Sequence, residues 1–319
     1  ILLYWAEKGI DGFRCDMAEM VPVEFWHWVI EKVKDKYPNI IFIAEIYNPG
    51  SYSSYINYGH FDYIYDKVGM YDTLRAVTIG SQSATAITSC WQNIGENGEK
   101  MLHFMENHDE QRIASDFFAG NGIKGRPSMV VSACIDKCPI MCYAGQELGE
   151  RGMDNEGFSG TDGRSTIFDY WAPDTLSRWY KDGELSDKHL TREEIDLKSF
   201  YSRLFNICTT ENAIGKGLFF DLMYVNPDSE QFNAHKEYAF LRKYNNEMLL
   251  IVANFSDKAQ HSQVVIPEHA FSYLQIENRG RVNAVELFTG QNISIDLQPN
   301  SPVNVQIPAN GAIILKCKA

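Results

Sequence analysis

Short apolar runs alternate with amphipathic segments along the first two thirds of the chain. Residues 22–37 carry apolar side chains at three- and four-residue spacing, which predicts a helix, and 71–79 and 191–210 predict two more. The apolar runs that predict strands are 12–16, 40–44, 61–65, 101–106 and 139–143. Strands that are apolar on both faces and alternate with helices are typical of a parallel sheet built from βαβ units.

The pattern changes after residue 215, where short strand candidates follow one another with turn residues and no helix between them. The seven candidates are 219–225, 238–244, 248–253, 262–266, 284–288, 293–297 and 312–316. Closely spaced strands of this kind predict an antiparallel β-sandwich. We therefore expect two parts, an α/β part at 1–215 and an all-β domain at 216–319.

The excess of acidic residues argues against nucleic acid as a binding partner. Acidic residues outnumber basic ones by 42 to 29, which gives a formal net charge of −13, and no cluster of Lys and Arg stands out. A protein that binds a phosphate backbone needs such a cluster, so nucleic acid is not an expected partner. Charged residues such as Asp136 and Lys137 interrupt the longest apolar runs, and so no membrane span is expected. The chain opens on Ile1 within a helical pattern, and no compartment is assigned.

Three groups of residues could suggest a metal site, but for each of them a role without a metal is favoured. Cys134, Cys138 and Cys142 are spaced by four, but they lie in an apolar stretch and are expected to pack as buried thiols. The loop with Asp154, Glu156 and Asp162 lacks the spacing of a calcium loop. His103 and His108, five apart on a predicted strand, would face opposite sides. No metal ligands are therefore expected in this chain.

Three predicted strands end on carboxylates, namely Asp16, Glu45 and Asp109. The separations are 29 residues (16 to 45) and 64 residues (45 to 109), close to one and two βα units. In a (β/α)₈ barrel the carboxyl ends of all strands open onto the same face, so these side chains would converge on one site. Spacing alone leaves catalytic and structural roles equally open.

The residues around these carboxylates resemble the three catalytic signatures of the α-amylase superfamily, glycoside hydrolase family 13. They read GFRCDMAE at 12–19, IAE at 43–45 and FMENHD at 104–109, in the family's order. The resemblance implies a (β/α)₈ TIM barrel, of which only strands 4 to 8 are present in this chain, followed by an all-β antiparallel sandwich domain. It also implies that Asp16 is the nucleophile, Glu45 the general acid/base and Asp109 the carboxylate that stabilises the transition state.

The same signatures suggest further site residues. Arg14 resembles the arginine that holds the nucleophile ionised, and His108 resembles the histidine that hydrogen-bonds the sugar ring. We also expect Asn107 and Tyr47 to bind substrate, although loop tyrosines are equally often simple packing residues. Retaining hydrolysis needs two carboxyl groups about 5 to 5.5 Å apart, one attacking and one protonating the leaving oxygen.

Nearby charges are expected to separate the ionisation of the two carboxyl groups. Arg14 shares a strand face with Asp16 and favours its ionised form, while Glu45 follows an apolar strand and is expected to stay protonated long enough to act as the acid. Arg112 is expected to pair with Asp109 or Glu110 in a structural role.

The chain departs from the family pattern at two places. The first family signature is absent, with the strands and loop domain around it, so we expect the missing N-terminal half of the barrel in cis or as a bound fragment. The chemistry needs no cofactor, and the ligands of any structural calcium would lie mostly in that upstream segment. Glu19 and Met20 stand where typical endo-acting α-amylases carry a Lys-His pair that contacts sugar beyond the cleavage point. The departure weakens the expectation of long starch as the substrate and leaves shorter maltooligosaccharides as an alternative.

The expected function is therefore a retaining α-glycoside hydrolase that acts on α-glucans or maltooligosaccharides through a glycosyl-enzyme on Asp16. A transglycosylase or glucan isomerase on the same site is the first alternative. A catalytically silent carbohydrate-binding homologue is the second.

Overall fold

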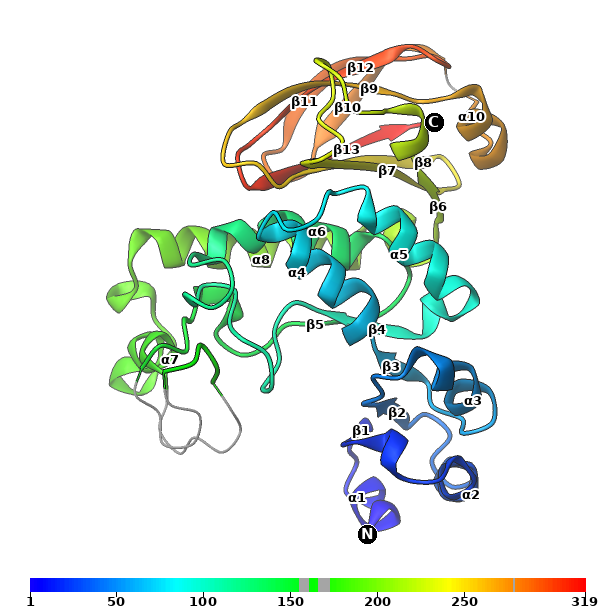
Figure 1. Cartoon of the computed structure of the whole chain (residues 1–319), viewed down its shortest axis with the longest axis vertical. Helices are drawn as coiled ribbons and strands as arrows, with labels where there is room; N and C mark the ends of the chain where they lie inside the picture. The colour runs from blue at the N-terminus through cyan, green and yellow to red at the C-terminus, as the bar shows by residue number, and fades with distance from the viewer. Residues whose placement is uncertain (155–160, 166–172, 278) are drawn as a thin grey trace.

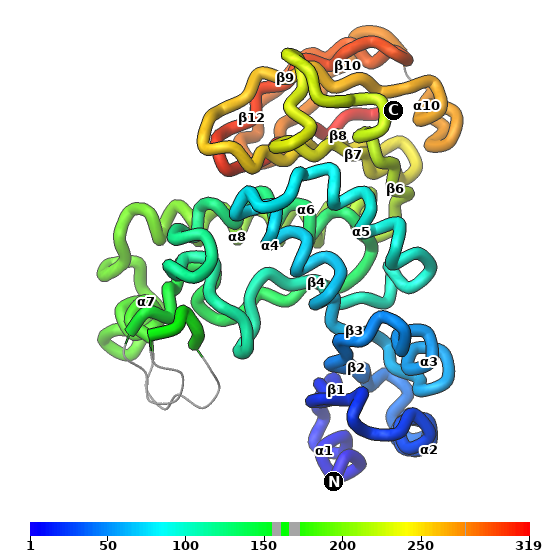
Figure 2. The backbone as a smooth tube through the Cα atoms, in the orientation of Figure 1, coloured from blue at the N-terminus to red at the C-terminus, as the bar shows by residue number. Residues whose placement is uncertain are grey.

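The computed structural model describes residues 1–154, 161–165, 173–277 and 279–319. The parallel sheet begins at the N-terminal end with the first helices and continues beside a layer of helices in the middle of the molecule, and the antiparallel sheets lie at the other end (Figure 1). The backbone trace shows the same three parts in chain order (Figure 2). No described helix is long and apolar enough to cross a membrane.

The first sheet is parallel and has five strands in the order β1-β2-β3-β4-β5, as the alternating pattern predicts. Its strands are β1 (Gly12–Cys15), β2 (Ile41–Ala44), β3 (Tyr63–Tyr65), β4 (Met101–Phe104) and β5 (Ile140–Met141). Among the described strands, β1 pairs only with β2 and β5 only with β4. The barrel strands expected in this chain thus form a continuous sheet that is open at both edges.

Helices precede, connect and follow these strands. They are α1 (Leu2–Glu7), α2 (Val23–Lys34), α3 (Tyr52–Asn57), α4 (Asp72–Thr78), α5 (Ala86–Ile94), α6 (Arg126–Cys134), α7 (Asp174–Trp179), α8 (Arg192–Thr210) and α9 (Asn212–Lys216). Helix α2 buries Trp26, Ile30 and Val33, the apolar face that its sequence predicts. Helix α8 begins at a capping box in which Thr191 and Glu194 exchange side-chain and backbone hydrogen bonds.

Short 3₁₀ and π helices fill several of the connections. The 3₁₀ turns are Ala18–Met20, Pro49–Ser51, Gly95–Lys100, Gly122–Gly125, Gln146–Leu148, Lys181–Gly183, Asp187–His189 and Met223–Val225, and Lys67–Tyr71 is a π turn.

The C-terminal strands form two antiparallel sheets. They are β6 (Leu218–Asp221), β7 (Glu237–Tyr244), β8 (Glu247–Asn254), β9 (Gln260–Val265), β10 (Gly280–Glu286), β11 (Gln291–Leu297), β12 (Pro302–Ile307) and β13 (Gly311–Lys318). Six strands form one sheet in the order β11-β10-β13-β8-β7-β6, and β12 pairs with β9 in the other. The expected sandwich is confirmed.

Three details of the expected sandwich were wrong. The strand predicted at 219–225 ends at Asp221, because its side chain accepts a hydrogen bond from the Met223 N–H and turns the chain into a 3₁₀ helix. Helix α10 (Glu268–Leu274) lies between strands where no helix was expected. Strand β12 was missed although its apolar residues alternate with Asn and Gln, as in a half-buried strand, because Pro302 opens it and proline is disfavoured within strands.

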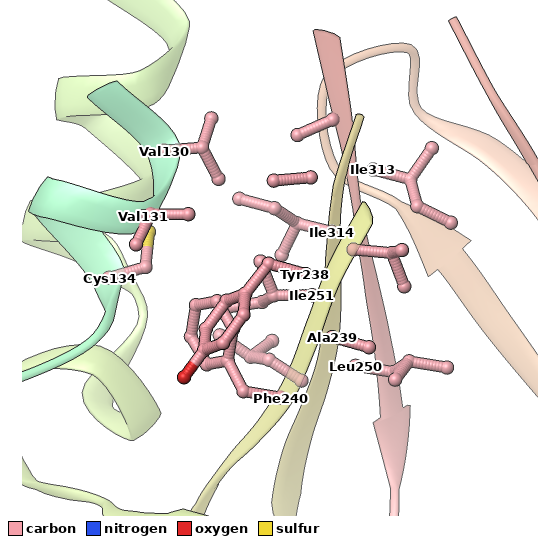
Figure 3. Close-up of a cluster of buried hydrophobic side chains, with 14 of the residues drawn as sticks. Val130, Val131, Cys134, Tyr238, Ala239, Phe240, Leu250, Ile251, Ile313 and Ile314 are labelled. Carbon is pink, nitrogen blue, oxygen red and sulfur yellow. The ribbon is translucent and has the colours of Figure 1, made fainter. Parts of the chain in front are cut away.

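A continuous core joins the helical layer to the larger antiparallel sheet. Val130, Val131 and Cys134 of α6 point towards the strands, where Tyr238, Ile251 and Ile314 meet them (Figure 3). The predicted boundary at residue 215 is therefore crossed by apolar packing.

Arg242 on β7 reinforces this junction. Its guanidinium is buried and donates to the carbonyl groups of Ile135, Ala213, Ile214 and Gly217, which lie at the ends of the helical layer. Burial lowers the pKa of Arg242 from its usual value. Among the described residues, no carboxylate lies within hydrogen-bond distance of this guanidinium. The four carbonyl oxygens accept its hydrogen bonds instead, which compensates for the burial of the charge.

The cysteines of the apolar stretch are free thiols. Cys134 is fully buried at the end of α6, while Cys138 and Cys142 are half-buried. Burial raises the pKa of Cys142 to about 12, and the nearby Glu147 and Glu106 add to the rise. Of the three thiols expected to be buried, only Cys134 is.

Candidate active site

The parallel register of β1 and β2 places Asp16 beside Glu45. Cys15 pairs with Ala44 at the last position of the two strands, and the Glu45 N–H donates to the Cys15 carbonyl at 3.1 Å. Each carboxylate is the next residue after its strand. The two side chains therefore leave the same edge of the sheet, as the strand-end pattern predicts.

Arg14 connects the two carboxylates. Its Nη1 donates to Asp16 Oδ1, its Nη2 lies 2.8 Å from Glu45 Oε1, and its Nε donates to the Tyr65 hydroxyl at 3.3 Å. Burial favours the neutral guanidine, but the hydrogen bonds to Asp16 and Tyr65 outweigh it and raise the pKa of Arg14 above its usual value. Arg14 therefore stays a cation between the two acids.

Glu45 is the most enclosed of the three expected catalytic carboxylates. It is 7% exposed, and its Oε2 accepts a hydrogen bond of 2.7 Å from the Met17 N–H. Tyr47 donates its hydroxyl to Glu45 Oε1 at 3.1 Å. Burial and the nearby Glu45 raise the pKa of Tyr47, so that its hydroxyl keeps the proton it donates. The expected apolar surroundings of Glu45 are thus replaced by three polar partners.

Asp16 is much more open, since its side chain is 73% exposed. Arg14 is the neighbour that the structure gives this carboxylate. An open carboxylate beside a fixed cation is accessible to a ligand in front of the sheet.

The end of β4 supplies the third carboxylate. Asn107 is 1% exposed, and its Oδ1 accepts hydrogen bonds from the N–H groups of Asp109 and Glu110 at 2.9 and 2.8 Å. This turn directs His108 and Asp109 outward, with His108 Nε2 3.3 Å from Asp109 Oδ2. Asn107 was expected to bind substrate, but the structure places it beneath the turn as a backbone acceptor.

These residues line one cleft of about 650 Å³. Six of the seven expected site residues meet there, namely Arg14, Asp16, Glu45, Tyr47, His108 and Asp109, and Asn107 does not. Met17, Glu19 and Met20 also line it. Glu19 and Met20 were noted only as departures from a motif. Their place in the turn directly after Asp16 was the signal that could have assigned them to the cleft.

Glu19 also shapes the wall opposite the strands. Its carboxylate oxygens accept from the N–H groups of Tyr47 and Asn48 at 3.4 and 3.2 Å. The turn after β1 is thereby tied to the loop after β2, which carries Tyr47. Tyr52 and Tyr55, which follow Tyr47 in the sequence, are buried in α3 and do not line the cleft.

Arg112 has a structural partner, though not one of the expected two. Its Nη1 lies 2.8 Å from Glu106 Oε2, and both side chains are 1% exposed. Glu106 Oε1 accepts the Ile113 N–H at 2.7 Å. Because Glu106 points inward from the strand end that carries Asp109, this ion pair supports the turn from below.

Two other groups that the sequence brought forward as candidate ligands lie outside the cleft. His103 is buried, with Nε2 3.3 Å from Asp66 Oδ2. In the acidic loop, Asp162 pairs with Arg164 at 2.8 Å, whereas Glu156 lies outside the described residues.

The chain matches the model of the alpha amylase catalytic domain over residues 1–178. It is similar to alpha-amylase MalA of Haloarcula japonica, with 33% identity over 160 residues that cover 48% of this chain and 22% of the relative. Alpha-amylase 2 of Dictyoglomus thermophilum is 24% identical over 269 residues, which cover 81% of this chain and 41% of the relative. A maltosyltransferase that uses maltose 1-phosphate, from Rhodospirillum rubrum, is 45% identical over 47 residues, or 15% of this chain and 7% of the relative.

Solved structures show the same fold at low identity. A maltogenic alpha-amylase from Thermotoga neapolitana has a TM-score of 0.67 at 19% identity and covers 99% of this chain and 63% of its own. An alpha-amylase from Geobacillus thermoleovorans, solved with acarbose, has a TM-score of 0.70 at 16% identity and covers 100% and 62%.

The chain spans less than half the length of the relatives it matches in sequence and less than two thirds of these two structures. The family model nevertheless covers more than half of the chain, including every residue of the cleft. The chain therefore belongs to the alpha-amylase family of glycoside hydrolases and transferases, glycoside hydrolase family 13.

Proposed function

We propose that this cleft carries out retaining hydrolysis of α-glucans or maltooligosaccharides. The observation that supports it is the contact of one guanidinium, that of Arg14, with both Asp16 and Glu45 at adjacent strand ends. Double displacement needs two carboxyl groups flanking one glycosidic bond. Asp109 and His108 line the same cleft and supply further polar contacts for a sugar ring.

In the proposed reaction, Asp16 attacks the anomeric carbon while Glu45 gives its proton to the leaving glycosidic oxygen. The C–O bond to the leaving group breaks as the bond to Asp16 forms. Glu45, now a carboxylate, takes a proton from water, and the water oxygen displaces Asp16 from the anomeric carbon. Two inversions leave the product with the substrate's configuration. Asp109 stabilises the positive charge that develops on the ring.

The contacts of Glu45 set a condition on this reaction. The Met17 N–H and the Tyr47 O–H donate to its carboxylate and the Arg14 guanidinium forms an ion pair with it, an arrangement that fits the ionised form. A glycosidic oxygen that reaches Glu45 must displace one of these donors when the proton is in place. Tyr47 is the one whose side chain is free to turn away, because Met17 donates from the backbone.

Replacing Asp16 by Asn tests the proposal. Release of reducing sugar from maltooligosaccharides should fall by several orders of magnitude, because the amide is no nucleophile, while binding measured by calorimetry persists. Asp35→Asn is the matched control, since Asp35 is exposed at the end of α2, outside the cleft. Near-normal turnover by the Asp16 variant contradicts the proposal, and product NMR that shows inversion contradicts the double displacement.

Transfer to a sugar acceptor is a second candidate for the same site. It is favoured by the maltosyltransferases among the relatives. The glycosyl-enzyme on Asp16 would then react with a sugar hydroxyl instead of water. Product analysis with added maltose separates the two, because transfer lengthens chains whereas hydrolysis only shortens them. Binding of maltooligosaccharide without either product would instead indicate a silent carbohydrate-binding homologue.

A further inference from the structure

A second cluster of ligand-type side chains lies outside the cleft, between helix α2 and the turn that leads from α3 to β3. His27 and Glu31 are one helical turn apart on α2, and His60 comes from the turn. Their side chains are 33%, 55% and 38% exposed. None of the three lines the cleft, and the reaction proposed above uses none of them.

The separations of their polar atoms fit the coordination shell of a small cation. Glu31 Oε2 lies 3.7 Å from His27 Nε2, and Glu31 Oε1 lies 3.5 Å from His60 Nε2. One ligand atom from each residue lies within 4.8 Å of the others. A tetrahedral zinc ion bound at about 2.0 to 2.1 Å holds neighbouring ligand atoms roughly 3.3 to 3.4 Å apart. A shift of a few tenths of an ångström therefore brings Glu31 to that spacing with either histidine.

His27 is held in the orientation that a metal ligand needs. Its ring stacks on Tyr58, with centroids 4.4 Å apart and planes 6° from parallel. Its Nδ1 lies 3.0 Å from the Tyr58 carbonyl oxygen. Metal-binding histidines commonly donate their other ring N–H to a backbone carbonyl, which fixes the tautomer and leaves Nε2 with a lone pair for the ion.

The backbone of the turn orients His60. Its φ is +67°, in the left-handed region that a residue with a side chain rarely adopts. In this conformation its Nε2 comes 2.9 Å from His27 Nδ1. Because His27 carries its proton on Nδ1, the facing His60 Nε2 is the nitrogen with the lone pair, and the Nε2 atoms of both histidines can therefore bind an ion.

We propose that His27, Glu31 and His60 form a binding site for a divalent transition metal, with Zn²⁺ the best match. Two imidazole nitrogens and one carboxylate suit zinc, whereas calcium and magnesium prefer oxygen ligands throughout. Water completes the shell on the exposed side. The ion links α2 to the α3–β3 turn and thereby stabilises the outer layer of helices behind β1, β2 and β3.

Zinc titration of the metal-stripped protein tests this site. Isothermal calorimetry should show binding that Glu31→Gln and His60→Ala each weaken at least about tenfold. Co²⁺ should give visible absorption bands of nitrogen and oxygen ligation in the wild type, without the near-ultraviolet charge-transfer band of a thiolate, and the same two variants should lose them. Zn²⁺ should also raise Tm in the wild type and not in the variants.

His235→Ala is the matched control, because His235 Nε2 lies 3.8 Å from Asp228 Oδ2 without a third ligand among the described residues. It should leave zinc affinity and the cobalt spectrum unchanged. His60→Ala removes a ligand and can also disturb the turn that carries it. Glu31→Gln keeps the size of an exposed helical side chain, so an effect of this variant reports the loss of the ligand alone. Equal zinc affinity in Glu31→Gln and the wild type, or a thiolate band with Co²⁺, would overturn the proposal.

Discussion

Arg14 Nη2 lies 2.8 Å from Glu45 Oε1. The contact joins β1, the edge strand of the parallel sheet, to the residue that follows its neighbour β2. The same guanidinium also donates to Asp16, the residue that directly follows its own strand. One cation therefore sets the relative position of two acids that come from different βα units. Its hydrogen bond to Tyr65 on β3 fixes it from a third strand.

Replacing Arg14 by Lys should disrupt this arrangement while the positive charge remains. A lysine ammonium is a compact donor and lacks the planar fork that meets Asp16, Glu45 and Tyr65 together. We expect kcat/KM on maltooligosaccharides to fall at least about 100-fold, because a misplaced acid or nucleophile loses most of the benefit of orientation. Steady-state kinetics measures this, and circular dichroism should show an unchanged fold. Full activity in the Lys variant would mean that charge alone suffices.

Replacing Tyr47 by Phe removes its hydroxyl and keeps its ring. Tyr47 turns away while Glu45 is protonated and can donate again to the Glu45 carboxylate that forms as the proton leaves. A hydrogen bond to a charged group contributes about 1.5–3 kcal/mol, so losing this one is expected to lower kcat about 10- to 100-fold. KM should change little, since the ring still offers an apolar face to a sugar. Tyr47→Leu, which removes the ring as well, should in addition raise KM. A Phe variant with raised KM and normal kcat would assign Tyr47 to sugar binding alone.

The strand ends of the site could be predicted because their pattern is local. A carboxylate follows β1 and β2 directly and Asp109 comes five residues after β4, and parallel pairing brings such strand ends to one edge. The contact between Arg14 and Glu45 could not be predicted this way, since it depends on the register of two strands 29 residues apart. The burial of Asn107 depends on a turn whose geometry the motif does not specify.

Two helices, α6 and α10, could not be predicted from the sequence, for different physical reasons. Every residue of α6 from Pro127 to Cys134 is buried, so the helix lacks a polar face and has no amphipathic period. Helix α10 is seven residues long, too short for the spacing of Ala270, Phe271 and Leu274 to be distinctive. The cluster around His60 depends on the left-handed backbone conformation of that residue. A histidine in the sequence does not predict this conformation.

Replacing Arg112 by Met should destabilise the protein strongly. The Glu106 carboxylate would be left buried without its cation, a loss that typically costs about 3–5 kcal/mol. Burial already raises the pKa of Glu106, and Arg112 opposes that rise. Urea denaturation measures the change in the free energy of unfolding.

Arg151→Met is the control for that measurement. Arg151 pairs with Asp116 at 2.7 Å, but the two side chains are 54% and 64% exposed. An exposed pair contributes at most about 1 kcal/mol. Equal effects of the two substitutions would contradict the role given to the buried pair.

The stability of the protein should depend on pH through His103. Burial disfavours its charged form, but Cys138 and Asp66 outweigh burial and raise the pKa of His103 well above its usual value. Its geometry agrees, because Nδ1 faces the Ser132 carbonyl at 2.8 Å and Nε2 faces Asp66 Oδ2 at 3.3 Å, so that both nitrogens meet acceptors. An imidazolium donates to both.

A pKa raised in the folded state means that the folded protein holds this proton more tightly than the unfolded chain. The stabilisation is complete below the unfolded pKa of about 6.5 and is lost as pH rises through the folded value. We therefore expect the free energy of unfolding of the wild type, relative to His103→Gln, to fall as pH rises above about 6.5, by at most about 1.4 kcal/mol per pH unit. Urea denaturation across this range measures it, with the exposed His235→Gln as control. Parallel curves for the wild type and His103→Gln would show that His103 is neutral in the folded protein.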